Sequence, residues 1–273
     1  MSNSVSVFFM GLLCWGLSLP AQAFEKEGFE LGVGSRLTQF NYNETLTLPA
    51  KSSETATFAT IQADARYHVD KDFLFFELKY EFAVDVASNY NGAVLTTGAA
   101  ATATDSLGFA NYELIANATL TPWMNLYLGA AYRIWTRYIA GSPGYNEIYS
   151  WSYFPVGAQF WFWKTNEWEF GTDISVRPTS NGLIQVITSA TYSGGQDSQM
   201  NLGSVTGYKL AFPVNYNWSK FSLLNSLWYE HSEIGQSNLV TNTTLAPKTG
   251  TGIYEPASKT DQYGLEVLLT YNL

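Results

Sequence analysis

Apolar and polar residues alternate from Phe29 to Leu273 in segments of about ten residues, and turn residues separate these segments. The clearest segment alternates between an apolar set and a charged set, which are Phe76, Leu78, Tyr80, Phe82, Val84 and Val86 against Glu77, Lys79, Glu81 and Asp85. Because successive side chains of a strand point to opposite faces, each segment has one apolar and one polar face. This repeat is typical of a membrane-spanning β-barrel, but a soluble sandwich with its apolar face inward has the same period. The ends of the chain distinguish the two.

The amino-terminal end predicts an export signal. Its apolar run from Val5 to Leu19 leads into Pro20-Ala21-Gln22-Ala23, which has small residues at the positions of a signal-peptidase site. A retained transmembrane anchor is the alternative, but a run of about fifteen apolar residues is short for one. We therefore divide the chain into a signal peptide, residues 1–23, and a barrel domain, residues 24–273.

Cleavage is expected directly after Ala23. Mass spectrometry of the membrane-purified protein should then find Phe24 as the first residue. An intact Met1 terminus would contradict the export signal.

The single cysteine, Cys14, lies within the signal segment. The preceding Leu13 does not fit a lipoprotein cleavage site, so we expect no lipid anchor. The processed chain enters an oxidising compartment without any cysteine, and packing and hydrogen bonding must stabilise it. A closed barrel in lipid supplies both. The formal net charge of -9 and the pI near 4.7 argue against a phosphate backbone as a ligand, so no nucleic-acid partner is expected.

The pattern predicts an all-β protein, a closed antiparallel transmembrane β-barrel of about ten strands, with eight or twelve as alternatives. The expected strands are Phe29–Tyr42, Ala56–Val69, Phe73–Ala87, Leu107–Leu120, Met124–Ile139, Tyr149–Trp163, Glu167–Arg177, Val205–Trp218, Phe221–Ser232 and Gln262–Leu273. Short turns are expected at one end, near Asp70, Pro122, Thr165 and Ser219. Longer loops are expected at the other end, over Asn43–Thr55, Ser88–Ser106, Ala140–Ile148, Pro178–Ser204 and Glu233–Asp261.

Two expected strands contain a proline, Pro155 and Pro213, within a repeated Phe-Pro-Val unit. Proline removes a donor from the strand ladder. We interpret both as β-bulges, with Pro213 on the inward face. The alternative is that one of these strands is broken, which would reduce the count to eight.

Aromatic residues make up 16% of the chain, and several stand where apolar faces meet turns. An interfacial aromatic girdle is expected at such positions, here formed by Trp123, Trp163, Trp168, Trp218 and Phe221.

The last segment alternates Tyr263, Leu265, Val267, Leu269, Tyr271 and Leu273 up to the chain end. It resembles the carboxy-terminal insertion signal of Gram-negative outer-membrane proteins, although the final residue is Leu273 where phenylalanine is most frequent in that family. The resemblance implies a location in the bacterial outer membrane, with outer-membrane lipid, lipopolysaccharide and the barrel assembly machinery as partners. The residues that carry this expected signal are Tyr263, Tyr271 and Leu273. The resemblance is architectural and implies no activity.

The face opposite the apolar one is rich in charges of both signs. The expected lumen charges are Asp64, Arg66, Glu77, Lys79, Glu81, Asp85, Arg133, Arg137, Glu169, Asp173, Arg177, Lys209 and Glu230. Such groups require pairing, so one hypothesis is an internal salt-bridge network that fills a narrow barrel. The other is a narrow ion or small-solute channel. Diffusion of large solutes is not expected, because water-filled porins need about sixteen strands.

An embedded hydrolase is a further alternative, since small outer-membrane barrels include omptin-like proteases and lipid A deacylases. His231 stands beside Ser232 near an outer loop, but neighbours on a strand face opposite ways. The chain lacks the paired-Asp and Asp-x-His pattern of omptins and the His-x-Ser spacing of the deacylases, and His68 lies near a short turn. We expect no catalytic residues, no metal and no cofactor. The leading hypothesis is a structural or surface-interaction role of the outer loops towards an unidentified extracellular ligand.

Overall fold

The computed structural model describes residues 28–45, 52–70, 73–93, 100–139, 144–191, 193–245 and 252–273. The expected signal peptide, residues 1–23, and its cleavage site lie outside these residues. No helix in the described part of the chain is long and apolar enough to cross a membrane.

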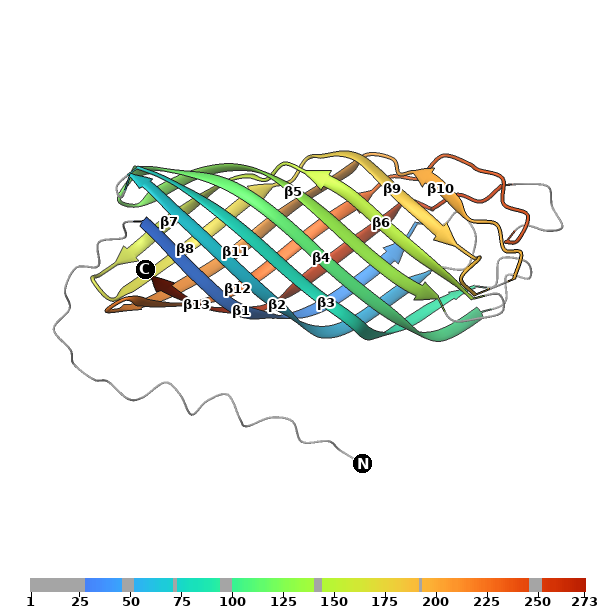
Figure 1. Ribbon diagram of the computed structural model, residues 1–273, viewed down its shortest axis with the longest axis horizontal. Helices are drawn as coiled ribbons and strands as arrows, with labels where there is room; N and C mark the ends of the chain where they lie inside the picture. The colour runs from blue at the N-terminus through green and yellow to red at the C-terminus, as the bar shows by residue number, and fades with distance from the viewer. Residues whose placement is uncertain are drawn as a thin grey trace, which may run out of the picture.

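The described residues contain thirteen antiparallel strands, which form one sheet that closes on itself. The strands are steeply tilted to the long axis (Figure 1). They are β1 (Gly28–Glu44), β2 (Ser53–Asp70), β3 (Leu74–Ala93), β4 (Ala100–Thr121), β5 (Met124–Ile139), β6 (Tyr145–Tyr153), β7 (Val156–Lys164), β8 (Trp168–Val176), β9 (Thr179–Ile187), β10 (Ser198–Asn201), β11 (Val205–Trp218), β12 (Phe221–Ile234) and β13 (Ser258–Asn272). The hydrogen-bonded ring runs through ten of them, in the order β1, β2, β3, β4, β5, β7, β8, β11, β12 and β13, and back to β1. The expected all-β closed barrel of ten strands is confirmed.

The three remaining strands extend this ring at the long-loop end. β6 continues the line of β7 and pairs with the second half of β5, and β9 continues the line of β8 and pairs with β6. The short β10 adds to the edge of β9. In its described part the chain thus passes along the barrel ten times, and the sixth and seventh passes are each divided into two strands.

The two expected bulges at prolines are wrong. Pro155 lies between β6 and β7, but the register towards β5 is the same on both sides, with Ala131 opposite Tyr153 and Leu128 opposite Val156. The carbonyl of Pro155 still accepts the amide of Gly129 at 2.9 Å. Pro213 faces inward as expected, and no register shift accompanies it. Each proline removes one donor from the ladder without inserting a residue.

The prediction of a loop over Pro178–Ser204 is wrong in part, because this segment contains strand structure. After Pro178 the chain resumes as β9, whose Ile184 and Val186 are buried inward while Gln185 faces out. Proline at this point interrupts the ladder, but the chain continues along the barrel as β9. The Pro178 carbonyl still accepts a hydrogen bond from the Phe154 amide at 2.9 Å.

The outer wall carries an apolar band at the short-turn end of the barrel. On β12 it extends from Phe221 to Tyr229, and on β13 from Tyr263 to Tyr271, which is the length of about nine residues that a tilted strand needs to cross a bilayer. Ring contacts link aromatic side chains along the short-turn edge of the band, which are Trp163, Trp168, Phe170, Tyr216, Trp218, Phe221 and Tyr271. The opposite edge carries the stacked pair Tyr80 and Tyr112.

Beyond this band the strands continue with polar outward residues. On β1 the outward side chains change from Phe29, Leu31, Val33 and Leu37 to Gln39, Asn41 and Asn43. This change indicates that the long-loop end of the barrel projects from the membrane into water. The carboxy terminus lies at the opposite end, beside the short turns (Figure 1).

Candidate functional site in the barrel lumen

Layers of side chains fill the long-loop half of the lumen, and the layer nearest the loops centres on Arg137. Its guanidinium is 1% exposed and pairs with Glu54 at 2.7 Å from β2 and with Glu147 at 2.8 Å from β6. The Tyr149 hydroxyl lies 3.0 Å from the same guanidinium. The Tyr42 and Tyr149 hydroxyls both donate to the Glu255 carboxylate, at 2.8 and 2.7 Å. We call these six residues the outer cluster: Tyr42, Glu54, Arg137, Glu147, Tyr149 and Glu255.

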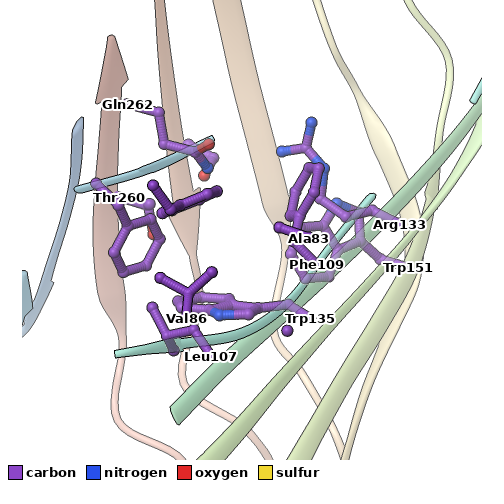
Figure 2. Close-up of a pocket in the computed structure, with 13 residues that line it drawn as sticks. Ala83, Val86, Leu107, Phe109, Arg133, Trp135, Trp151, Thr260 and Gln262 are labelled. Atoms are coloured by element: carbon purple, nitrogen blue, oxygen red, sulfur yellow. The ribbon is translucent and has the colours of Figure 1, made fainter. Parts of the chain in front are cut away.

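An apolar layer lies directly below the outer cluster. Trp135 packs edge-on against Phe40 and tilted against Tyr149, with ring centroids 4.9 and 5.2 Å apart. Figure 2 shows the cavity beside it, with Leu107 and Trp135 on one side and Thr260 and Gln262 of β13 on the other. The cavity measures about 20 Å³, which is room for roughly one water molecule.

A second charged layer follows, formed by Arg133, Arg177 and Glu230. The two guanidinium groups share the Glu230 carboxylate, with Arg177 at 2.6 Å and Arg133 in a short contact. Arg177 also lies 3.6 Å from Glu113, which accepts a hydrogen bond from Tyr153. We call these five residues the middle cluster. Its charged groups are all paired, as groups buried in a protein interior require.

The next ion pairs across the lumen are made by Arg36 of β1. Its guanidinium bridges Glu81 of β3 at 2.8 Å and Glu266 of β13 at 2.9 Å. The Thr60 hydroxyl donates to Glu81 at 2.8 Å, and the ring of Trp228 lies 4.6 Å from the guanidinium carbon. These contacts join strands from both sides of the β1–β13 seam.

Below these layers a cavity of about 780 Å³ extends to the short-turn end, and we call it the inner cavity. Its wall includes the turn residues Pro122, Thr165 and Asn166, so it opens at that end. Arg66 lies 2.7 Å from the Glu77 carboxylate, which also forms an ion pair with the Lys79 ammonium at 2.9 Å. The lumen is therefore filled towards the loops and hollow towards the turns.

The structure places twelve of the thirteen expected lumen charges on the inward face. Ten of them are buried or paired in the layers and on the cavity wall, which are Asp64, Arg66, Glu77, Lys79, Glu81, Arg133, Arg137, Glu169, Arg177 and Glu230. The other two, Asp173 and Lys209, line the inner cavity. The expected pairing of Arg66 and Lys79 with Asp64 and Glu77 is present.

Asp85 is the exception, because its side chain is exposed on the outer wall. The register of β3 against β4 shifts between Ala83, opposite Phe109, and Val86, opposite Leu107. Asp85 lies in this bulge with a φ of 52°. The inserted residue reverses the alternation, so that Ala83 and Val86 face in while Asp85 faces out. A strict period of two cannot predict such a reversal.

Sequence reasoning missed several residues of the layers. Glu54, Glu147 and Glu255 fall in segments that were expected to be loops, where no facing can be assigned. Arg36 and Glu266 lie within expected strands and alternate there with apolar neighbours, so the same period-two signal could have identified them.

The histidines occupy different surroundings. His231 faces outward, with Nδ1 2.8 Å from the Asp261 carboxylate, whereas Ser232 lines the lumen. The two therefore point to opposite sides of the wall and do not form an acyl-transfer pair. His68, expected near a short turn, faces the inner cavity, with Nε2 3.1 Å from Glu30 and its ring stacked on Phe75.

Glu255 belongs to the irregular segment between β12 and β13, outside the membrane-spanning strands. Burial, reinforced by the charges of Glu147 and Glu44, raises the pKa of Glu255 to about 8. A carboxyl whose pKa is higher in the folded than in the unfolded state stabilises the fold fully at low pH, and this contribution is lost as the pH rises towards about 8. The buried site therefore favours the neutral form of Glu255, and ionisation at higher pH places an uncompensated charge beside Glu147 and Glu44.

We expect the segment around Glu255 to loosen as the pH rises from about 4.5 to about 8. Amide hydrogen exchange should report it at Ser237 and Glu255, which hydrogen-bond each other. Glu255→Gln keeps the neutral form and should remove the pH dependence. The same dependence in both proteins would contradict this assignment.

No protein-family model and no curated protein sequence matches the chain. Among solved structures it is similar to the outer membrane protease OmpT from Escherichia coli, with 9% identity, a TM-score of 0.61, and coverage of 93% of this chain and 99% of that chain. Weaker similarities are to the translocator domain of the autotransporter NalP from Neisseria meningitidis, with 7% identity, a TM-score of 0.42 and coverage of 90% and 88%. Neisserial surface protein A gives 12% identity, a TM-score of 0.33 and coverage of 90% and 98%. With its apolar band and closed ring of ten strands, this chain has the fold of the bacterial outer-membrane β-barrels.

Proposed function

We propose that the chain is a non-conducting outer-membrane barrel that serves a structural or surface-interaction role at its long-loop end. The observation that carries this proposal is the stack of the outer cluster, the Trp135 layer and the middle cluster across the lumen. A solute would have to separate Arg137 from Glu54 and Arg177 from Glu230 to pass. Separation leaves buried charges uncompensated, and the loss of one partner of such a pair costs about 3 to 5 kcal/mol, so the stack forms a barrier rather than a filter.

The stack also supports a role for the rim. It fixes β2, β5, β6 and the segment at Glu255 to one another at the projecting end of the barrel. Binding residues are often carried by loops on such a rigid scaffold. In the described part of that segment, Leu239 and Tyr254 are 64% and 42% exposed. The ligand is an extracellular molecule that the rim contacts.

The first test is conductance of the purified barrel in planar lipid bilayers. We expect small or no single-channel currents, because ions cannot cross the paired layers. The double variant Arg133→Ala with Arg137→Ala should lower stability and should not convert the barrel into a selective pore. A large and stable wild-type conductance would contradict the proposal and favour the narrow-channel hypothesis.

The double variant also separates the two hypotheses in a second measurement. If the arginines lined an ion pathway, their removal would shift selectivity towards cations with little loss of stability, since lumen substitutions tune selectivity. A lower melting temperature without a change of selectivity supports the sealed barrel.

We infer no enzymatic role for this chain. The similar structure from Escherichia coli is that of a protease, but at 9% identity the likeness concerns the fold alone. His231 and Asp261 lie together on the outer wall, and Ser232 faces the other way. Incubation of the purified barrel with peptide substrates should therefore give no cleavage, and cleavage that His231→Ala abolishes would contradict this inference.

A further inference from the structure

Among the described residues that line the inner cavity, Lys209 and Asp173 have no oppositely charged atom within 4.0 Å. Within the described part of the chain, the Lys209 ammonium has no carboxylate oxygen within 4.0 Å, while every other inward arginine and lysine has one. Asp173 likewise has no basic nitrogen within 4.0 Å among those residues. Both line the inner cavity, and they are diagonal neighbours on β11 and β8, since Asp173 stands opposite Ala211.

The surroundings keep these two groups apart. Tyr127 donates its hydroxyl to Asp173 at 2.6 Å, and the Gln159 amide lies 3.5 Å away, so the carboxylate is oriented by neutral groups. Glu266 lines the same cavity, but its carboxylate is already engaged by Arg36 at 2.9 Å. Two opposite charges thus face one water-accessible space without neutralising each other directly.

The cavity wall offers further groups suited to a small polar ligand. Asn117 Nδ2 and Asn217 Oδ1 are buried atoms of the described chain without a hydrogen-bond partner, and both residues line the cavity. Phe75 and Trp161 add apolar surface to the same wall. A volume of about 780 Å³ falls within the usual range for small-molecule sites.

We propose that the inner cavity binds a small zwitterion, such as a free amino acid, with its carboxylate on Lys209 and its ammonium on Asp173. A ligand with one charge would leave the other group uncompensated and would bring net charge into the barrel interior, which is costly. A zwitterion pairs both groups and adds no net charge. The cavity opens at the short-turn end, so the ligand enters from the side opposite the loops. This site does not depend on whether the barrel conducts.

The test is equilibrium dialysis of radiolabelled alanine against the purified barrel in detergent micelles. Saturable binding of alanine is expected, with acetate and methylammonium each binding at least about ten-fold more weakly because each satisfies one charge only. Lys209→Gln and Asp173→Asn should each weaken alanine binding by about ten-fold or more.

Matched controls are available on the outer wall. Lys259→Gln removes a paired lysine, and Asp261→Asn alters a carboxylate that accepts a tyrosine hydroxyl at 2.6 Å, as Asp173 does. Both should leave alanine binding within about two-fold. Absence of saturable alanine binding, or acetate binding as tight as alanine, overturns the proposal. Should a cavity variant fail to fold, the comparison of the three probes on the wild-type barrel decides alone.

Discussion

Replacing Arg137 by methionine should lower the free energy of unfolding by about 3 to 5 kcal/mol. The guanidinium is 1% exposed and is the only basic group paired with Glu54 and Glu147 among the described residues. Its loss leaves two buried carboxylates without compensation. The guanidinium carbon also lies 4.6 Å from the Tyr42 ring, so packing is lost together with charge.

The measurement is urea unfolding of the barrel in micelles, followed by tryptophan fluorescence. Lys259→Gln is the control, because its pair with Glu233 is about half exposed and such pairs contribute about 1 kcal/mol or less. Adding Glu54→Gln and Glu147→Gln to the methionine variant should restore part of the stability, since neutral amides remove the uncompensated charge. An Arg137→Met variant as stable as the control would mean that the outer cluster is hydrated and does not seal the lumen.

Sequence alternation predicts most of this fold because lipid and lumen impose opposite demands on successive residues. β5 and β11 begin and end at the expected residues, and both have apolar outward sets and defined turns at the short end. The alternation predicts too short a length for the strands that extend beyond the apolar band. β4 begins at Ala100, seven residues before the expected start, and its exposed residues Thr102 and Thr104 are polar, so the contrast that marks a membrane strand has disappeared there.

The lumen could be predicted only as far as the register is regular. Arg133, Arg177 and Glu230 lie in segments with regular alternation, so the apolar or polar character of neighbouring residues predicts that their side chains point inward. Asp85 lies in a bulge that depends on pairing with β4, which no local pattern reveals. Glu255 comes from an irregular segment, and its place beside Tyr42 is set by tertiary contacts alone. The pairing partners likewise depend on the curvature of the closed wall.

Deleting Tyr263–Leu273 should abolish folding of the barrel. β13 pairs along its whole length with both β1 and β12 and closes the ring between the two ends of the sheet. Without it, β1 and β12 would present open edges to lipid, where each unpaired backbone group costs several kcal/mol. The truncated chain should lose the heat-modifiable migration on gels that marks a folded barrel.

Leu273→Phe is the matched variant for this deletion, because it changes the expected insertion signal without touching the ladder. Leu273 is 63% exposed, and its amide donates to the Phe29 carbonyl at 3.0 Å, a contact that phenylalanine retains. Assembly should be unchanged or improved. If the truncated chain still inserted and shifted on heating, another pair of strands would have to close the ring, and the seam between β1 and β13 would not be the closure that the barrel requires.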